Sequence, residues 1–388
     1  MQPVRIKVFG VGGAGSNAVD RMMQIGILGV EFVVANTDAQ ALRMSEAPSK
    51  IQLGLRFTRG LGAGGNPTVG ARAAEESADE IREAVAGADM VFVAAGMGGG
   101  TGTGAAPVVA RIARSLGILT VAVVTEPFGF EGKRRKMVAE AGIRELRGSV
   151  DTLLVVPNDR LLQVISETVS LDIAFRIADD VLRQGIQGVS ELVTMPGLIN
   201  VDFADVCAVM SQQGYALMSI GQGRGENKAV VAAEMALRSP LLDIRSVEGA
   251  KGLLINVTGG SDLSLVEVSR AVEAITRSAG PDTNIIFGTT LDDKMEGRAQ
   301  VILVATGIGG ADTAVVELPQ EQPVEAAAPE PQREAPAPVR LSLAPVAGPP
   351  AWEGENTLDI PAFLRRRQRA RLLEPAEAEP AARVSCAL

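Results

Sequence analysis

A run of glycines and threonines between two apolar segments is the feature that most constrains how this chain folds. Residues 98–104 read GGGTGTG, after the apolar run 90–95 and before a helical pattern that begins at residue 105. This order predicts a strand, a loop and a helix. Glycines let backbone N–H groups surround an anion, a helix N-terminus favours negative charge, and two threonine hydroxyls add donors. We therefore expect a phosphate-binding loop, different from the P-loop, which needs a lysine.

Two further glycine clusters accompany the first. Residues 10–17 read GVGGAGSN and follow an expected strand over 4–9, and residues 60–67 read GLGAGGNP. Taken alone, the cluster at 10–17 matches the G-x-G-x-x-G fingerprint of nicotinamide oxidoreductases, which also needs an acidic residue at the end of the second strand. Asn36 stands at that place, and Asp38 comes two residues later. An oxidoreductase, or loops that are simple turns, are the alternatives to a nucleotide phosphate site.

Short apolar runs alternate with helical periodicity between residues 4 and 165, which predicts an α/β fold with a doubly wound parallel sheet. Ligands of such sheets bind at the carboxyl ends of the strands, an edge that all three clusters could reach. A long helix from Ser170 is the only expected connection to a smaller α/β unit over 214–308. The expected strands are 4–9, 31–35, 90–95, 118–124, 151–156, 215–222, 252–258, 283–288 and 299–305, and the expected helices are 15–25, 69–86, 102–116, 132–147, 159–165, 227–237 and 264–278.

Composition limits the classes of function. The chain has 388 residues, 46% of them hydrophobic, with a formal net charge of −9, no histidine and two cysteines. The negative charge argues against nucleic acid as a main partner, and the lack of histidine excludes histidine-based acid–base chemistry and histidine metal sites. No uncharged apolar run reaches the ~18 residues of a membrane span, and the first strand leaves no room for a signal peptide. We expect a cytoplasmic protein with reduced thiols and no direct membrane insertion.

The glycine clusters together resemble those of the tubulin/FtsZ family of GTPases, whose signature is similar to residues 98–104. The resemblance implies a protein that binds and hydrolyses GTP, assembles head to tail into filaments and forms the division ring at mid-cell, on the inner face of the membrane. A GTP-binding paralogue that does not polymerise is the alternative within the family. The implied parts are a GTP-binding domain (1–169), a central helix (170–197), a C-terminal activation domain (198–308), a disordered linker (309–356), a docking peptide (357–368) and a variable tail (369–388).

Nucleotide contacts are expected in all three clusters and beyond them. A nucleoside triphosphate carries about four negative charges and the loops carry no cation, so we expect Mg²⁺ to accompany the nucleotide. Guanine needs a carboxylate that accepts from its N1–H and its amino group; the simpler interpretation of Asp179 and Asp180 is a solvated helix face. The loops suggest phosphate contacts at Gly13, Gly15, Gly100, Thr101 and Gly102, beside the small residues Ala14 and Ser16, with amide contacts from Asn17 and Asn158. The resemblance implies Ala63 and Gly64 beside the γ-phosphate, Glu131 and Arg135 near the ribose and phosphates, and Phe175 and Asp180 on the base.

The glycine loops hold no base or carboxylate that could position a water molecule for hydrolysis. Asn200, Asp202 and Asp205 form the pattern N-x-D-x-x-D at the expected start of a helix. One such aspartate is most simply an N-cap, which contributes ~1 kcal/mol to helix stability. The pattern is also similar to the synergy loop of the family, which completes the GTP site of the next subunit. The resemblance therefore implies that Asp205 and Asp202 are catalytic, that Asn200 orients them, and that hydrolysis is coupled to assembly.

The character of the chain changes after residue 308. Prolines, alanines and acidic residues over 309–356 leave too little apolar surface to offset the entropy of ordering, which predicts a disordered linker. The apolar island that follows is typical of a docking peptide, and Asp359–Arg367 is similar to the family's peptide for membrane tethers and division regulators. The arginines over 365–371 could contact an anionic membrane weakly or simply be solvated.

Overall fold

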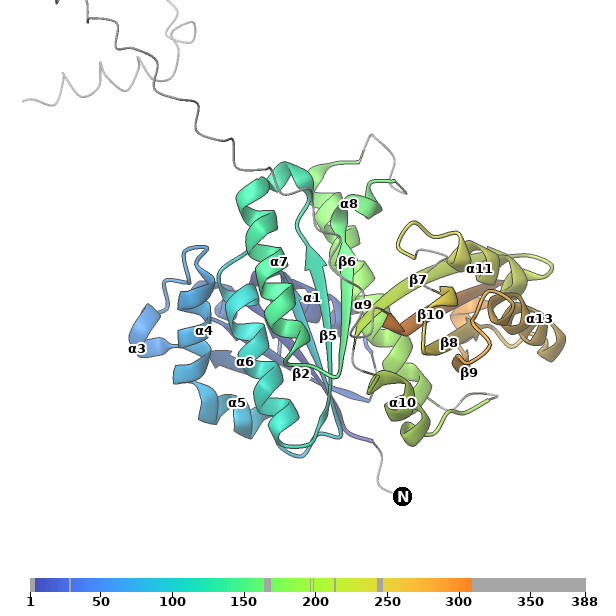
Figure 1. Cartoon of the computed structure of the whole chain (residues 1–388), viewed down its shortest axis with the longest axis horizontal. Helices are drawn as coiled ribbons and strands as arrows, with labels where there is room; N and C mark the ends of the chain where they lie inside the picture. Colours follow the sequence, from blue (N-terminus) through green and yellow to red (C-terminus); the bar gives the residue numbers. More distant parts are fainter. Residues whose placement is uncertain are drawn as a thin grey trace, which may run out of the picture. The chain divides into compact units, whose positions relative to one another are not determined.

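A ten-stranded sheet organises the described part of the chain, which in this computed structural model comprises residues 4–27, 29–163, 169–195, 197, 199–212, 214–242 and 247–308. The expected linker, docking peptide and tail lie outside the described residues. The strands are β1 (Ile6–Val11), β2 (Val30–Asn36), β3 (Ser49–Gln52), β4 (Met90–Gly96), β5 (Leu119–Glu126), β6 (Thr152–Pro157), β7 (Tyr215–Arg224), β8 (Gly252–Gly259), β9 (Asn284–Leu291) and β10 (Arg298–Ile308). Their order across the sheet is β3-β2-β1-β4-β5-β6-β7-β10-β8-β9, of which Figure 1 shows the part from β5 to β9 with labels.

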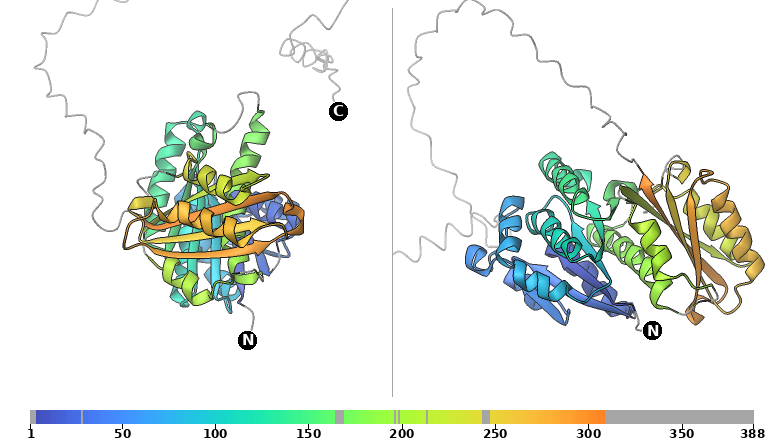
Figure 2. Two further views of the ribbon diagram at one scale, coloured as in Figure 1. Left: turned by 90° about the vertical axis from the view of Figure 1, so that its right-hand side faces the viewer. Right: turned by 60° about the horizontal axis from the view of Figure 1, so that its bottom comes forward.

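Helices cover both faces of the half of the sheet that runs from β3 to β6 (Figure 2). All strand pairs in this half are parallel, which confirms the doubly wound sheet expected from the sequence. Alternate strand residues serve two cores, because successive side chains point to opposite faces: Val8 and Phe92 belong to one, and Phe9 and Val93 to the other. One face carries α1 (Gly12–Ile25) and α9 (Leu171–Thr194), and the other carries α4 (Pro67–Glu76), α5 (Ala78–Val85), α6 (Thr101–Ser115) and α7 (Lys133–Arg147).

The second half of the sheet is mixed. β10 pairs antiparallel with β7 and β8, and β8 pairs parallel with β9. One face packs on α11 (Lys228–Leu237) and α13 (Leu265–Thr276), and the other packs on α9 and α10 (Phe203–Met210). The two halves are joined not only by the long helix, as expected, but also by parallel pairing of β6 with β7 at Leu153 and Leu154. The expectation of a single helical connection is therefore wrong, because a shared sheet and a shared core also connect the halves.

Two segments depart from the expected elements. Residues 39–52 contain α2 (Ala39–Met44) and β3, which hydrophobic periodicity does not predict because β3 fully buries only Ile51. The single helix expected over 69–86 is two helices, α4 and α5, which meet at Ser77. Ser77 is buried, and its Oγ accepts the N–H of Gly54 at 3.1 Å, so the break ties both helices to the chain after β3. The remaining short elements are α3 (Leu55–Thr58), α8 (Asn158–Leu161), η1 (Gly129–Glu131) and η2 (Asp293–Met295).

Candidate functional site

The carboxyl ends of the central parallel strands open into a pocket of about 230 Å³. α1 begins directly after β1, and α6 begins after the loop that follows β4, so two helix N-termini meet at this pocket. The first-turn N–H groups of a helix have no partner within the helix, and the helix dipole adds positive potential there. The lining residues are Gly13, Ala14, Gly96, Met97, Gly99, Gly100, Thr101, Gly102, Thr125, Pro127, Glu131, Arg135, Asn158, Phe175, Ala178 and Asp179.

The glycines of the two loops have different tasks. Gly13 and Gly99 have nothing within 4 Å of the position that a Cβ would take, so both leave space open in the pocket. Gly98 has a φ of 96°, a conformation that favours glycine. Gly104 packs so closely on α4 that a Cβ would lie 2.0 Å from the carbonyl oxygen of Pro67. The first pair of glycines therefore makes room for a ligand, whereas Gly98 and Gly104 shape the loop and its packing.

The two threonines of the second loop already have partners within the protein. Thr103 is buried, and its Oγ1 accepts the N–H of Gly98 at 2.9 Å. The expectation that both hydroxyls serve the ligand is therefore wrong for Thr103, which stabilises the loop. Thr101 lines the pocket, and its Oγ1 lies 2.6 Å from that of Thr37, where either oxygen can donate.

Of the residues expected on the first loop, the structure brings only Gly13 and Ala14 to the pocket wall. Gly15 is buried, and its missing Cβ lets α1 lie close to β4. Ser16 donates from its Oγ to a backbone carbonyl of its own helix at 2.7 Å. Asn17 is exposed on α1. These last three residues shape or flank the loop in this structure, and their contact with a nucleotide stays a prediction.

The third glycine cluster lies against the second. A Cβ on Gly100 would come 2.8 Å from the Cβ of Ala63 and 2.9 Å from the backbone nitrogen of Asn66. Ala63 is buried, whereas Gly64 is exposed with a φ of 58°. Neither Ala63 nor Gly64 lines the pocket. The third cluster therefore packs against the loop at residues 98–104 outside the pocket lining. Its expected role beside a γ-phosphate stays a prediction.

An aromatic cluster forms the wall of the pocket at α9. Phe175 lies edge-on to Phe128, with ring centroids 5.4 Å apart, and to Phe130, with centroids 6.3 Å apart. Phe175 also lines the pocket, as expected for a side chain that stacks on a base. Phe128 is fully buried and Phe130 is exposed, so the cluster reaches from the core to the rim.

The carboxylate beside this aromatic wall belongs to Asp179, not to Asp180. Residues 175, 178 and 179 share one face of α9, because side chains three and four positions apart on a helix are neighbours. Asp180 is turned away from the pocket, pairs with Arg183 at 2.6 Å and accepts from the Nε2 of Gln184 at 2.5 Å. The structure therefore places Asp179, and not the expected Asp180, on the pocket wall, and contact of either carboxylate with a base stays a prediction. The helical spacing from Phe175 was the signal in the sequence that could have identified Asp179.

Asp179 is a buried carboxylate with one nearby cation. It is 8% exposed, and its Oδ2 lies 3.5 Å from the Nε of Arg21 on α1. Burial raises the pKa of Asp179 to about 6, with a smaller contribution from Asp180, while Arg21 opposes that rise. With a pKa of about 6, the carboxyl of Asp179 is mostly ionised at neutral pH. It can therefore accept hydrogen bonds from a ligand without first losing a proton.

Glu131, Arg135 and Asn158 complete the pocket wall. Glu131 accepts the N–H of Phe128 at 2.9 Å and pairs with Arg135 at 2.8 Å, so both its oxygens are engaged. Among the lining residues that the structure describes, Arg135 is the only cation. Asn158 is buried, and its Oδ1 has no hydrogen-bond partner. Buried polar atoms are normally paired, so this oxygen points to a ligand donor.

Asn200, Asp202 and Asp205 lie at the other end of α9 from the pocket, next to α10 (Figure 1). All three are exposed. Asp202 is the N-cap residue of α10, but its side chain makes no capping hydrogen bond, so the simple N-cap interpretation is wrong for this residue. Asn200 Oδ1 accepts the N–H of Gly197 at 2.7 Å, which orders the turn before the two aspartates.

The pocket suits an anionic ligand that carries a planar group. Its phosphate end offers helix N-termini and open glycines, and its other end offers an aromatic ring, a buried carboxylate and an unpaired amide oxygen. Within the described ranges, no group of three or more acidic or cysteine side chains is placed to hold a metal ion. No helix in the same ranges is long and apolar enough to span a membrane.

Known proteins that are similar to this chain include nucleotide-binding proteins of one family. The chain matches the model of the tubulin/FtsZ family GTPase domain over residues 5–166 and that of the FtsZ family C-terminal domain over residues 214–309. It is similar to an empty FtsZ dimer from M. jannaschii, with 48% identity and a TM-score of 0.76 over 78% of this chain and 88% of that one. A mutant FtsZ from M. jannaschii gives 48% identity and a TM-score of 0.76 over 79% and 92%. A GTPγS-bound protofilament of CetZ2 from Haloferax volcanii, at 21% identity and a TM-score of 0.67 over 80% and 95%, shares the fold.

Proposed function

The chain belongs to the tubulin/FtsZ family and is a GTPase, and we propose that it assembles head to tail into filaments that form the cytokinetic ring. In this proposal the pocket of one subunit binds GTP, and the loop that holds Asp202 and Asp205 in the next subunit completes the catalytic site. The dimer and the protofilament among similar structures support self-association. A heterologous contact of this kind extends into a filament because it does not close.

The phosphates are the part of GTP that the glycine loops would hold. Gly13 and Gly99–Gly102 line the pocket at the start of two helices, where first-turn N–H groups have no helical partner, and Arg135 adds one guanidinium. Because Arg135 is already paired with Glu131, the protein supplies little net positive charge. A Mg²⁺ ion would enter with the nucleotide and would supply the positive charge that the pocket residues lack.

The base and ribose are the parts that α9 and its neighbours would recognise. Asp179 accepts from guanine N1–H and from the exocyclic amino group, and Phe175 packs on the face of the base. Asn158 Oδ1 is an acceptor without a partner. Glu131 is a carboxylate at the pocket wall and suits the ribose hydroxyls. A purine without those two donors would cover the buried Asp179 carboxylate without donating a hydrogen bond to it, which disfavours the binding of that purine.

One observation carries the proposal of a shared catalytic site. The two carboxylates that line the pocket are Glu131, which is paired with Arg135, and Asp179, which stands at the base end. Asp202 and Asp205 are exposed, but the part of α9 from Asp179 to Thr194 separates them from the pocket by roughly 23 Å. They cannot reach the GTP of their own subunit. In a head-to-tail contact, Asp205 of the neighbouring subunit would accept a hydrogen bond from the attacking water, with Asp202 beside it and Asn200 ordering the turn.

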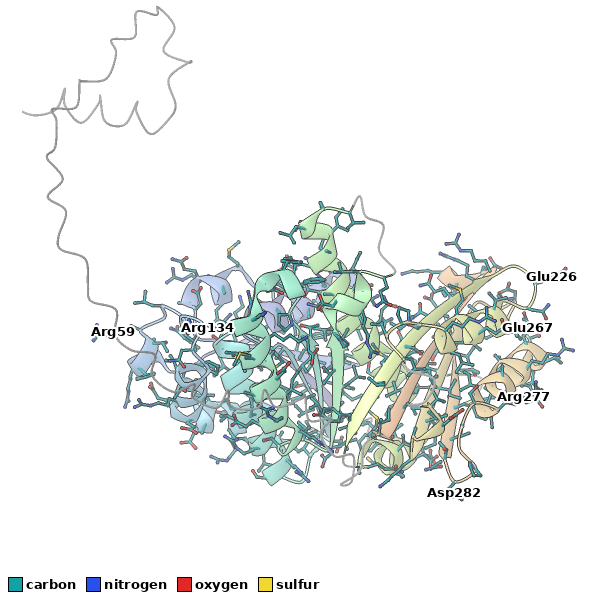
Figure 3. All side chains as sticks on the ribbon, turned by 45° about the horizontal axis from the view of Figure 1, so that its top comes forward. Arg59, Arg134, Glu226, Glu267, Arg277 and Asp282 are labelled. Atoms are coloured by element: carbon teal, nitrogen blue, oxygen red, sulfur yellow. The ribbon has the colours of Figure 1, made fainter. Side chains whose placement is uncertain are left out.

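The concentration dependence of GTP hydrolysis tests this proposal. With the full chain and Mg²⁺, we expect negligible turnover per molecule below a threshold protein concentration and a steep rise above it. Asp205→Ala should remove the rise, whereas Glu226→Ala should keep it. Glu226 is an exposed acidic residue in the turn between β7 and α11 (Figure 3), and it belongs neither to α10 nor to the residues that line the pocket. A rate per molecule that is constant with concentration would mean that each subunit carries its own catalytic group, and the proposal would fail.

The place of the filament in the cell is part of the same proposal. Division at mid-cell needs a link to the membrane, and Asp359–Arg367 would provide it by binding a membrane tether or a division regulator. That segment lies outside the described residues. Deletion of 357–368 should abolish recruitment to vesicles that carry a tether while leaving GTP hydrolysis unchanged.

A further inference from the structure

We propose that Arg21 is a positioning residue that determines base specificity, because it holds the Asp179 carboxylate in the ionised, acceptor form that selects guanine over adenine. The inference rests on the proposed function, since it assumes that the pocket binds a purine nucleotide at Asp179. Arg21 itself does not line the pocket, so it would act through Asp179 and not by touching the nucleotide.

The position of Arg21 is set by two contacts across helices. Arg21 lies on α1, which begins at the phosphate loop, whereas Asp179 lies on α9. The Nε of Arg21 is 3.5 Å from Asp179 Oδ2, and its Nη1 donates to the carbonyl oxygen of Arg176 at 3.0 Å. The guanidinium is therefore anchored by the backbone of α9 while it faces the carboxylate. One helix thus carries the phosphate loop at its start and the counterion of the base acceptor further along.

Other charged groups near Asp179 are already engaged elsewhere. Asp180 on the same helix is paired with Arg183, and Arg176 is paired with Asp172 at 2.9 Å on the exposed side of α9. Elsewhere in the pocket lining, Glu131 and Arg135 pair with each other. Among the described residues, Arg21 is the only cation within ion-pair distance of Asp179.

The charge of Asp179 depends on a balance between burial and Arg21. Burial raises the pKa of Asp179, Asp180 raises it further, and Arg21 lowers it, with about 6 as the result. An opposite charge at this distance typically lowers the pKa of a carboxyl by ~1–3. Without Arg21, the pKa of Asp179 would therefore rise to neutrality or above it, and at least half of the Asp179 carboxyls would hold a proton at pH 7.

The protonation state decides which base the carboxyl can bind. An ionised carboxylate only accepts, which matches the N1–H and amino donors of guanine. A protonated carboxyl donates one hydrogen bond, which matches the N1 of adenine, an acceptor. Loss of the Arg21 charge should therefore weaken GTP binding at neutral pH and reduce the discrimination against ATP. A side chain that only ties α1 to α9 would affect both nucleotides alike.

The test is the pH dependence of GTP and ATP binding by nucleotide-free full chain, from about pH 5.5 to about pH 9. For the wild type, GTP affinity should fall only below about pH 6. For Arg21→Met, the midpoint should move up by ~1–3 pH units, GTP affinity at pH 7 should drop by roughly tenfold, and most of it should return at pH 9. Arg21→Lys keeps the charge and should restore much of the wild-type profile. Arg176→Met is the matched control and should leave the profile unchanged.

Two results would overturn the inference. The first is that Arg21→Met weakens GTP binding and ATP binding equally at every pH. The second is that the midpoint of the pH profile does not move in Arg21→Met. Either result would mean that Arg21 only connects α1 to α9. If Arg21→Met is too unstable to measure, Arg21→Gln removes the same charge: a midpoint higher in Arg21→Gln than in Arg21→Lys supports the charge role, and equal midpoints in the two variants contradict it. Failure of the proposed function looks different: the wild type would not bind GTP, or Asp179→Ala would bind it as tightly.

Discussion

Replacing Asp179 with asparagine should make the nucleotide-free protein more stable while it weakens GTP binding. The folded protein holds this carboxylate at 8% exposure, which costs free energy when the group is charged. Asparagine has nearly the same shape and carries no charge. Its former partner Arg21 is 29% exposed and can be solvated by water after the substitution.

The size of the effect follows from the pKa of Asp179, which folding raises from its ordinary value of 3.8 to about 6. Above pH 6 the carboxyl is ionised in both the folded and the unfolded chain, and the full penalty of roughly 3 kcal/mol applies to the folded state. Below pH 6 the folded state takes up a proton that the unfolded state lacks, so the penalty shrinks, to roughly half by pH 5. Asp179→Asn should therefore raise the free energy of unfolding by roughly 3 kcal/mol at pH 8 and by about half of that at pH 5.

Urea unfolding of the two proteins at both pH values, followed by circular dichroism, measures this difference. Asp180→Asn is the matched control: it removes an adjacent carboxylate that is partly exposed and paired with Arg183, so it should give no gain in stability. A lower free energy of unfolding for Asp179→Asn at pH 8, or a gain that is the same at both pH values, would refute the argument that this charge is held at a cost for ligand binding.

Mixing two inactive variants tests the shared catalytic site. Gly13→Val fills open space in the pocket, and Asp205→Ala removes the loop carboxylate. A one-to-one mixture should recover up to about a quarter of wild-type GTP hydrolysis, because half of the pockets and half of the loops are intact and both must meet at one interface. No recovery above the separate variants would contradict intersubunit completion. Gly104→Ala should lower stability by about 3 kcal/mol in thermal melts, since its Cβ would lie 2.0 Å from a carbonyl oxygen, whereas Gly99→Ala should keep stability and weaken nucleotide binding. Equal melting temperatures for the two alanine variants would show that the α4–α6 contact relaxes freely.

The fold was predictable where the apolar residues of the sequence are also the residues that the structure buries. The parallel strands β1, β4, β5 and β6 are short apolar runs between helices, so their alternation with helical segments was enough. β3 was not predictable, because it is short and fully buries only Ile51. The break at Ser77 was missed although residues 77–80 read SADE, a helix-start pattern, and the hydrogen bond that Ser77 accepts from Gly54, far away in sequence, is seen only in the structure.

The site was predictable as a location but not in every residue. The glycine loops placed the pocket correctly, because both lie between a parallel strand and a helix N-terminus, at the edge of the sheet where ligands bind. Thr103 and Gly104 belong to the same run but serve the packing of the loop, which only their neighbours reveal. The choice between Asp179 and Asp180 depends on the rotation of α9 about its axis, which the packing of its apolar face decides.

The sequence by itself determined the class of sheet, the edge at which a ligand binds, and the chemistry of loops that hold an anion. These properties are local, because they depend on periodicity and on backbone freedom within a few consecutive residues. Only the tertiary structure decided that β6 pairs with β7, that Arg21 faces Asp179, and that Asp205 lies at the end of α9 remote from the pocket. Each of these depends on how one element is placed against another, and that placement results from the packing of the whole core.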